Sequence, residues 1–249
     1  RQMCIRDSYS ISNSADSYGG KCLGTRSNPS NLIEKLELRQ KFKMISLEQI
    51  LKKCRIIPVL TIRNIEDAVP LAEAIFEGGL SAIEITLRTP EGFSALEAVT
   101  KHFPKFSIGV GTVIHNMDIR RAKESGASFA VSPGINIDLI EKASAEKLPY
   151  LPGIQTSSEA LLGLRLGIKF LKFFPAKIAG GIEGLKQIAP VYPELMFCPT
   201  GGISFDEASE YLAQKNVISV GGSFASPQNL IEKRDWNAIK ALAQRAARL

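Results

Sequence analysis

A lysine stands in the middle of an apolar segment, where a charged side chain is unusual. Lys172 occurs in the run Lys169-Phe170-Leu171-Lys172-Phe173-Phe174-Pro175. Successive residues of a β-strand point to opposite faces, so Lys172 would share one face with Phe170 and Phe174. Burial on that face would favour the neutral amine, which attacks carbonyl carbons. At this point a catalytic Lys172 competes with a lysine that reaches solvent from a strand edge.

A second strand-like segment, Ala82–Arg88, carries polar residues at every other position. Glu84 and Thr86 alternate with apolar residues, and Arg88 joins their face if the strand extends that far. A carboxylate beside a buried amine can move protons, and an arginine at the end of the strand can hold a carboxylate through a two-pronged contact. A structural ion pair of Glu84 with a lysine or arginine explains the same pattern equally well.

Two glycine turns follow the last two strand-like segments. They are Thr200-Gly201-Gly202-Ile203-Ser204 and Gly221-Gly222-Ser223. Glycine lets backbone N–H groups approach an anion, and barrel enzymes often bind phosphate at the loops after their seventh and eighth strands. The two turns together favour a phosphate site, to which Ser223 adds a hydroxyl. Thr112 ends the run Gly109-Val110-Gly111-Thr112 and would place a hydroxyl at the catalytic rim, although an ordinary strand-to-loop turn explains this residue better when it is taken alone.

The segments that would position these residues alternate between strand and helix patterns. The apolar runs predict eight strands: Ile56–Ile62, Ala82–Leu87, Phe106–Gly111, Phe129–Ser132, Tyr150–Gly153, Phe170–Phe174, Leu195–Thr200 and Val217–Gly221. Amphipathic spacing with capping residues predicts the helices. These are Leu47–Lys53 after the cap Ser46, Glu66–Glu77 after Asn64, one from Pro90 to His102, one from Asn116 to near Gly126, Ile137–Glu146, Ser157–Leu166, Gly181–Ile188, Phe205–Gln214 and Trp236–Arg248 after Asp235.

Eight strands that alternate with helices predict a (β/α)8 TIM barrel in a single domain, with the N-terminal helix Leu47–Lys53 before it. The strands are almost continuously apolar, as in parallel sheets that are covered on both faces. An open doubly wound sheet is the alternative. It more often shows a glycine-rich turn after its first strand, whereas Ile56–Ile62 is followed by Arg63-Asn64-Ile65.

The net charge of +6 is concentrated near the start of the 249-residue chain. Residues 1–43 carry a net charge of +4, with eight Lys/Arg and four Asp/Glu. The remainder has no basic stripe with interleaved aromatics, so a nucleic-acid partner is not expected. Residues 1–43 read as a disordered or non-native leader, and we expect the regularly patterned part of the chain to begin near Met44. No apolar run reaches the length of a membrane span.

The cysteines and histidines do not suggest a metal or disulfide site. The four cysteines, at positions 4, 22, 54 and 198, show no CxxC spacing, and His102 and His115 are far apart. We therefore expect no metal and no cofactor. Cys54 and Cys198 adjoin strand-like runs and read as small buried apolar residues.

In combination and in order, the motifs of Met44–Leu249 resemble one enzyme family. It is the class I 2-keto-3-deoxy-6-phosphogluconate (KDPG) aldolases, which are often also 4-hydroxy-2-oxoglutarate (KHG) aldolases. The matching motifs are Glu84-Ile85-Thr86-Leu87-Arg88-Thr89, Gly109-Val110-Gly111-Thr112-Val113, Ser132-Pro133-Gly134, Pro152-Gly153-Ile154, Lys172-Phe173-Phe174-Pro175-Ala176, Phe197-Cys198-Pro199-Thr200-Gly201-Gly202-Ile203 and Gly221-Gly222-Ser223.

The resemblance implies a metal-free, cytoplasmic lyase of the Entner–Doudoroff pathway, assembled as a homotrimer. Its partner would be a small-molecule 2-oxo acid substrate that carries a phosphate. Lys172 would form the Schiff base and Glu84 would transfer protons. The other expected contacts are Arg88 and Thr112 with the pyruvyl group, Phe174 and Thr200 along the site, and Gly201, Gly202, Gly222 and Ser223 at the phosphate end.

Two residues depart from the family pattern. Lys177 stands where the family most often has glutamate, and Phe224 stands where a tryptophan often follows the glycine-serine turn. Neither change removes a catalytic group, but Lys177 would alter the charge of the rim and the acceptance of longer anionic substrates. The preferred substrate of the two remains open.

Three other function classes remain as alternatives. A phosphosugar isomerase or epimerase would use the glycine turns without needing Lys172. A non-catalytic phosphosugar binder would explain the turns but not the alignment of Lys172, Glu84 and Arg88. A nucleic-acid binder rests only on the charge of residues 1–43.

Overall fold

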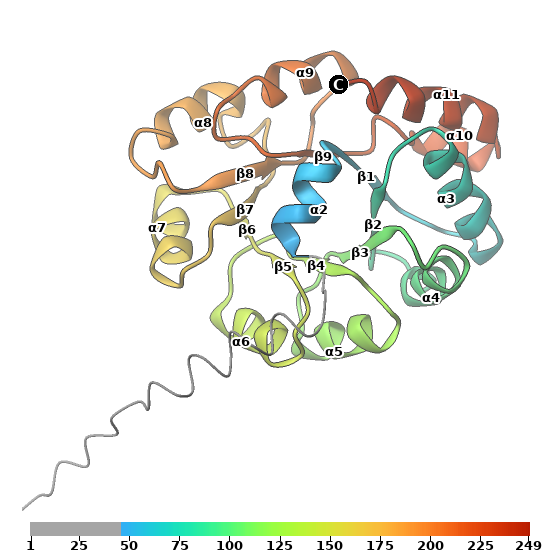
Figure 1. Ribbon diagram of the computed structural model, residues 1–249, viewed down its shortest axis with the longest axis horizontal. Coiled ribbons are helices and arrows are strands. Elements are labelled where there is room, and N and C mark those ends of the chain that lie inside the picture. Colours follow the sequence, from blue (N-terminus) through green and yellow to red (C-terminus); the bar gives the residue numbers. More distant parts are fainter. Residues whose placement is uncertain (1–45) are drawn as a thin grey trace, which may run out of the picture. The chain divides into compact units, whose positions relative to one another are not determined.

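The computed structural model describes residues 46–249, which belong to one compact unit. The predicted leader, residues 1–43, lies outside the described residues. Figure 1 shows the strands at the centre of this unit, with the helices arranged around them as an outer ring. The helix α2 (Leu47–Lys53) lies across the middle of the view.

All paired strands are parallel and form two sheets. The first is ordered β5 (Tyr150–Leu151), β4 (Phe129–Val131), β3 (Ser107–Gly111), β2 (Ala82–Thr86), β1 (Ile56–Leu60) and β9 (Val220–Gly222). The second is ordered β6 (Gly153–Ile154), β7 (Phe170–Phe173) and β8 (Met196–Pro199). Only Pro152 separates β5 from β6, and the single bridges Phe197–Val217 and Thr200–Gly221 connect the other ends. The arrangement is a TIM-barrel-like α/β fold, as predicted.

The predicted strand positions are confirmed, with two corrections. The predicted strand Tyr150–Gly153 is interrupted at Pro152, because proline has no N–H to donate to a neighbouring strand. The predicted strand Val217–Gly221 begins only at Val220, where pairing with Ile56 of β1 starts. Val217 makes an isolated bridge to Phe197 instead, so the apolar run extends beyond the paired segment.

The helices follow in chain order around the sheets. They are α3 (Ala68–Glu77), α4 (Gly92–His102), α5 (Asn116–Glu124), α6 (Ile137–Ala145), α7 (Ser157–Arg165), α8 (Gly181–Ile188), α9 (Phe205–Leu212), α10 (Gln228–Glu232) and α11 (Trp236–Ala246). The short α10 was not among the predicted helices. No helix within residues 46–249 has both the length and the apolar character needed to cross a membrane.

The predicted caps are confirmed at two of three helices. The Ser46 hydroxyl accepts from Gln49 N at 3.2 Å, and the Gln49 side chain accepts from Ser46 N, which completes a capping box. Asp235 accepts from Ala238 N at 3.0 Å at the start of α11. The prediction for Asn64 is wrong. A 3-10 turn, Ile65–Asp67, precedes α3. Asn64 makes no capping hydrogen bond, and its amide nitrogen donates to the Asp67 carboxylate.

The helix α2 covers the end of the sheets where the strands begin. Its residues Ile50 and Leu51 are buried, and Glu48 and Lys52 line a surface pocket together with Lys169, just before β7. The core is apolar between the sheets and the helices, and Phe129, Phe173 and Phe197 are its largest fully buried side chains. Because α2 occupies one end, the polar residues at the carboxyl ends of the strands face the other.

Candidate active site

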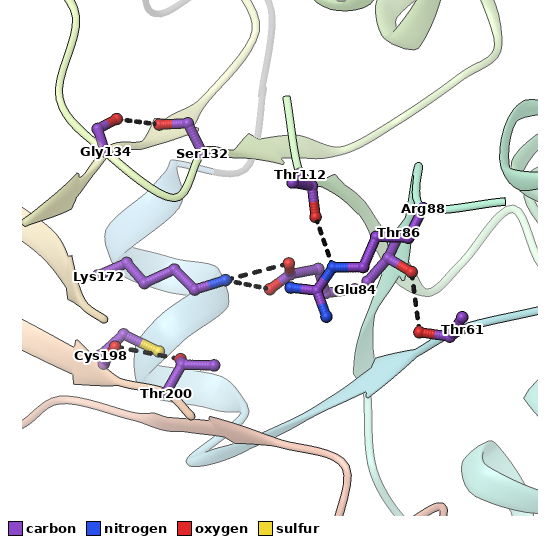
Figure 2. Close-up of polar contacts among 10 residues, drawn as sticks. All are labelled: Thr61, Glu84, Thr86, Arg88, Thr112, Ser132, Gly134, Lys172, Cys198 and Thr200. Carbon is purple, nitrogen blue, oxygen red and sulfur yellow. Dashed lines mark hydrogen bonds and ion pairs between the residues drawn. The ribbon is translucent and has the colours of Figure 1, made fainter. Parts of the chain in front are cut away.

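The centre of the site is a buried ion pair between two strands from different sheets. Lys172 of β7 donates from Nζ to Oε1 of Glu84 at 3.2 Å and to Oε2 at 3.4 Å. Both residues are only 4% exposed, and Figure 2 shows their side chains pointing toward each other. The alternative of a lysine that reaches solvent from a strand edge is therefore wrong. A buried charge of this kind requires its partner, since an uncompensated ion is costly to desolvate.

Small neighbours make room for this pair. Glu84 lies in register with Gly109 of β3, and Lys172 lies in register with Gly153 of β6. A Cβ atom on Gly111 would stand 1.9 Å from Glu84 Oε1, far inside contact distance. The Glu84 carboxylate can therefore occupy this position only because residue 111 is glycine. The sequence placed Gly111 at the end of a predicted strand but gave no sign of this steric demand.

The aromatic ring of Phe174 covers the amine on the side of the loop after β7. The Nζ atom of Lys172 lies 5.3 Å from the centre of that ring, within range of a cation–π contact. Gly201 lies against the same ring, because a Cβ atom there would stand 3.2 Å from it. Phe174 thereby connects the lysine to the first glycine turn.

Arg88 and Thr112 form a second polar pair at the carboxyl ends of β2 and β3. Arg88 Nε donates to Thr112 Oγ1 at 3.1 Å, and Arg88 is exposed to solvent (Figure 2). Thr112 has a φ of 32°, a backbone conformation that is rare for residues other than glycine. Strained residues of this kind often occur at functional sites. The terminal guanidinium nitrogens of Arg88 remain available for a carboxylate.

The two glycine turns lie side by side, as the sequence predicts. Thr200 forms a bridge to Gly221, and a Cβ atom on Gly221 would stand 2.5 Å from Thr200 Oγ1. Gly201 and Gly202 have φ values of 101° and 76°, in the region that favours glycine. In the second turn, Gly222 is buried against the Phe224 ring and Ser223 is exposed.

A buried thiol lies beside the lysine. Cys198 of β8 is in register with Lys172 and is 3% exposed, which confirms its prediction as a small buried residue. Burial raises the pKa of the Cys198 thiol to about 11, because the thiolate would lose its hydration. The nearby ammonium of Lys172 opposes this effect, and Glu84 adds to it. Cys198 is therefore an uncharged neighbour of the ion pair.

Sequence reasoning missed one polar contact on the barrel wall. The Oγ1 atoms of Thr61 and Thr86 are 3.1 Å apart, and Thr86 is fully buried beside Glu84 in β2 (Figure 2). The available signal was a threonine near the end of the apolar run Ile56–Ile62. Among residues 46–249, no group of three or more His, Cys, Asp or Glu side chains is placed to hold a metal ion.

Comparisons with known proteins agree with this geometry. The family model described as KDPG and KHG aldolase matches residues 47–242. The KHG/KDPG aldolase of Escherichia coli strain K12 is 40% identical over 201 residues, which is 81% of this chain and 94% of that enzyme.

Two solved structures have the same fold as well as similar sequences. A KDPG aldolase from Legionella pneumophila, with pyruvate captured as a covalent carbinolamine intermediate, is 42% identical with a TM-score of 0.78. The match covers 80% of this chain and 97% of that chain. The aldolase of Zymomonas mobilis ZM4 with 3-phosphoglycerate is 40% identical with a TM-score of 0.77, over 82% and 96% of the two chains.

The residues matched by the family model, 47–242, include Glu84, Lys172, both glycine turns and all the strands. The chain therefore belongs to the KDPG and KHG aldolase family and is a lyase of the aldolase class.

Proposed function

We propose that this protein is a Schiff-base-forming aldolase with Lys172 as its nucleophile. It cleaves 2-dehydro-3-deoxy-6-phosphogluconate (KDPG) to pyruvate and glyceraldehyde 3-phosphate, 4-hydroxy-2-oxoglutarate (KHG) to pyruvate and glyoxylate, or both. The observation that carries the proposal is the buried pair of Lys172 Nζ and Glu84 Oε1 at 3.2 Å. An amine and a proton acceptor at this distance are the two groups that such a reaction requires.

The first step is formation of the covalent adduct. A proton passes from the Lys172 ammonium to Glu84 within the pair, so the site gains no net charge and the amine becomes a nucleophile. The amine attacks the C2 ketone of the substrate and gives a carbinolamine. Glu84 then protonates the departing hydroxyl, and loss of water leaves an iminium. Arg88 and Thr112 hold the substrate carboxylate by charge-assisted hydrogen bonds.

The second step is cleavage of the C3–C4 bond. The Glu84 carboxylate takes the proton of the C4 hydroxyl, and the electron pair of the C3–C4 bond flows into the iminium. The products at this stage are an aldehyde and an enamine on Lys172. Glu84 returns its proton to C3, and water then hydrolyses the resulting iminium to release pyruvate. Glu84 thus acts as both base and acid, a role typically worth about 10²- to 10⁴-fold in rate.

The glycine turns are proposed as the distal end of the site. Gly201, Gly202 and Gly222 would present backbone N–H groups to the phosphate, and Ser223 would add its hydroxyl. Thr200 and Phe174 would line the path between these turns and Lys172. The adjacency of the turns supports this assignment, since Thr200 bridges to Gly221.

The remaining features of the proposal come from family membership. We propose a complete (β/α)8 barrel with α2 before it, assembled as a homotrimer in the cytoplasm and acting in the Entner–Doudoroff pathway. The reaction as written uses only protein groups and water, with no cofactor. Size-exclusion chromatography with light scattering tests the assembly, since a monomeric or dimeric mass would contradict the trimer.

Trapping of the adduct tests the function. The protein is incubated with pyruvate and borohydride, digested with trypsin and mapped by mass spectrometry. Reduction should place a pyruvyl group on Lys172 and block cleavage there, so that residues 170–177 appear as one modified peptide. Lys172→Ala should give no adduct. A folded wild-type protein without an adduct would reject the aldolase and favour a phosphosugar isomerase or a non-catalytic binder on the same turns.

A further inference from the structure

Lys177 is a cation beside the glycine turns that the proposed mechanism does not use. Its N–H donates to Gly201 O at 3.2 Å, and the preceding Ala176 N donates to Thr200 O at 2.8 Å. A Cβ atom on Gly202 would stand 2.9 Å from the Cβ of Lys177. The loop after β7 therefore runs alongside the first glycine turn, and the stem of Lys177 packs directly on it.

The ammonium of Lys177 is held by a carboxylate that has another role. Lys177 Nζ lies 3.3 Å from Glu207 Oε1, and the two side chains are 64% and 37% exposed. The other oxygen, Oε2, accepts from Ser204 N at 2.7 Å as part of the capping box of α9. Donation from Ser204, reinforced by Lys177, lowers the pKa of the Glu207 carboxyl to about 2. Glu207 is therefore fixed and ionised, whereas the exposed ammonium of Lys177 is held by this ion pair.

This contact is easily exchanged for a stronger one. Ion pairs between exposed side chains contribute little to stability, so breaking the pair costs little. A phosphate carries more charge than a carboxylate and offers more acceptor oxygens to an ammonium. An anion bound at Gly201 and Gly202 would lie next to the stem of Lys177, within the range of its flexible side chain.

We propose that Lys177 is a specificity-determining residue that leaves Glu207 and binds the terminal phosphate of the substrate. The inference rests on the proposed function, which puts the phosphate at the glycine turns. In the phosphorylated sugar acid the phosphate is attached at C6, two carbons beyond the cleaved bond's C4. In 4-hydroxy-2-oxoglutarate the distal carboxylate is attached directly to C4. Lys177 therefore favours the longer, phosphorylated substrate.

Direct binding tests the contact without any turnover. The probe is 3-phosphoglycerate, which has a phosphate but no ketone and so forms no Schiff base. Isothermal titration calorimetry should show about three- to tenfold weaker binding by Lys177→Gln than by wild type, as for loss of one charge-assisted contact. The matched control is Lys186→Gln, which removes an exposed lysine paired with Glu183 on α8 and should leave the Kd unchanged. The difference between the variants should shrink at high salt.

Releasing Lys177 from Glu207 should change the affinity for 3-phosphoglycerate in the opposite direction. Glu207→Gln keeps the capping box, because glutamine serves at that position, but it releases Lys177. Its affinity for 3-phosphoglycerate should rise by about twofold, the size expected for an exposed ion pair. The double variant Lys177→Gln/Glu207→Gln should bind like Lys177→Gln alone, since the released cation is absent. If Glu207→Gln raised the affinity by the same factor with and without Lys177, the exchange would be contradicted.

Kinetics separate this inference from the proposed function. Lys177→Gln should lower kcat/KM about three- to tenfold for the phosphorylated substrate and leave the value for 4-hydroxy-2-oxoglutarate within about twofold. It should still form the pyruvate adduct. The specificity role is overturned if both substrates change equally, if neither changes, or if wild type does not bind 3-phosphoglycerate. A missing pyruvate adduct in wild type would instead reject the aldolase chemistry, and the calorimetry would still decide the role of Lys177.

Discussion

Replacing Gly111 by alanine should move the Glu84 carboxylate, the proposed acid and base, without changing Glu84 or Lys172 themselves. The new Cβ would stand 1.9 Å from Glu84 Oε1, 2.6 Å from its Cδ and 2.9 Å from its Cγ. Ordinary van der Waals contact begins near 3.4 Å, so Oε1 must retreat by about 1.5 Å. Gly111 is not among the glycines with positive φ, so the backbone accepts alanine and the effect is purely steric.

The displacement sets the expected size of the effect. A retreat of about 1.5 Å away from the β3 strand changes the 3.2 Å contact with Lys172 Nζ and the position from which the base acts. Misplacement by about 1 Å can cost about 10²-fold in rate, so kcat for retro-aldol cleavage should fall by about that factor. The free energy of unfolding should fall by about 1–3 kcal/mol, as for an overpacked interior.

The assay is a coupled measurement of pyruvate release, with a urea melt on the same sample. Gly134→Ala is the matched control, because no atom lies within 4 Å of the Cβ that it would add. Its kcat should stay within about twofold of wild type, and its free energy of unfolding should stay within about 1 kcal/mol. A folded Gly111→Ala protein with kcat within twofold of wild type would refute the link between this glycine and the carboxylate.

Three further perturbations have defined outcomes. Lys172→Ala should lose almost all retro-aldol activity while circular dichroism shows a retained fold, and substantial turnover would remove Lys172 as the nucleophile. Because burial holds the pKa of Cys198 at about 11, iodoacetamide at pH 8 should label the Cys198 peptide only in denaturant. Burial raises the pKa of Tyr150 to about 12, so its phenol keeps its proton when folded and loses it when unfolded. Stability should therefore fall between about pH 10 and 12, by up to about 2–3 kcal/mol, and Tyr150→Phe should flatten that fall in urea melts; an unchanged slope would contradict it.

The order of elements could be predicted because its signals are local. Apolar runs and capping residues mark each strand and most helices, so even the capping box at Ser46 and Gln49 is confirmed. The start of β9 is different, because it depends on pairing with β1, which lies far away in the sequence. Asn64 shows a similar limit, since its preference for a cap was overridden by a 3-10 turn and the Asp67 carboxylate.

The site was predictable where a residue conflicts with its surroundings. A lysine and a glutamate in apolar strands are costly unless they meet, and the structure pairs Lys172 with Glu84. Strand alternation gives the face of each side chain but not the distance across the barrel. The Thr61–Thr86 contact and the steric demand at Gly111 depend on how neighbouring strands pack, which the sequence pattern does not give. Threonine and glycine are common in strand ends and turns, so neither residue stands out in the sequence.

The division of the strands between two sheets has a consequence for folding. Glu84 belongs to the six-stranded sheet and Lys172 to the three-stranded sheet, and the two sheets adjoin at Pro152 and at the single bridge Thr200–Gly221. Neither sheet alone contains a proton acceptor next to the amine. Activity during refolding therefore reports docking of the two sheets, and it should recover later than the far-ultraviolet signal of the helices. An enzyme built in this way can act only after its two sheets have docked.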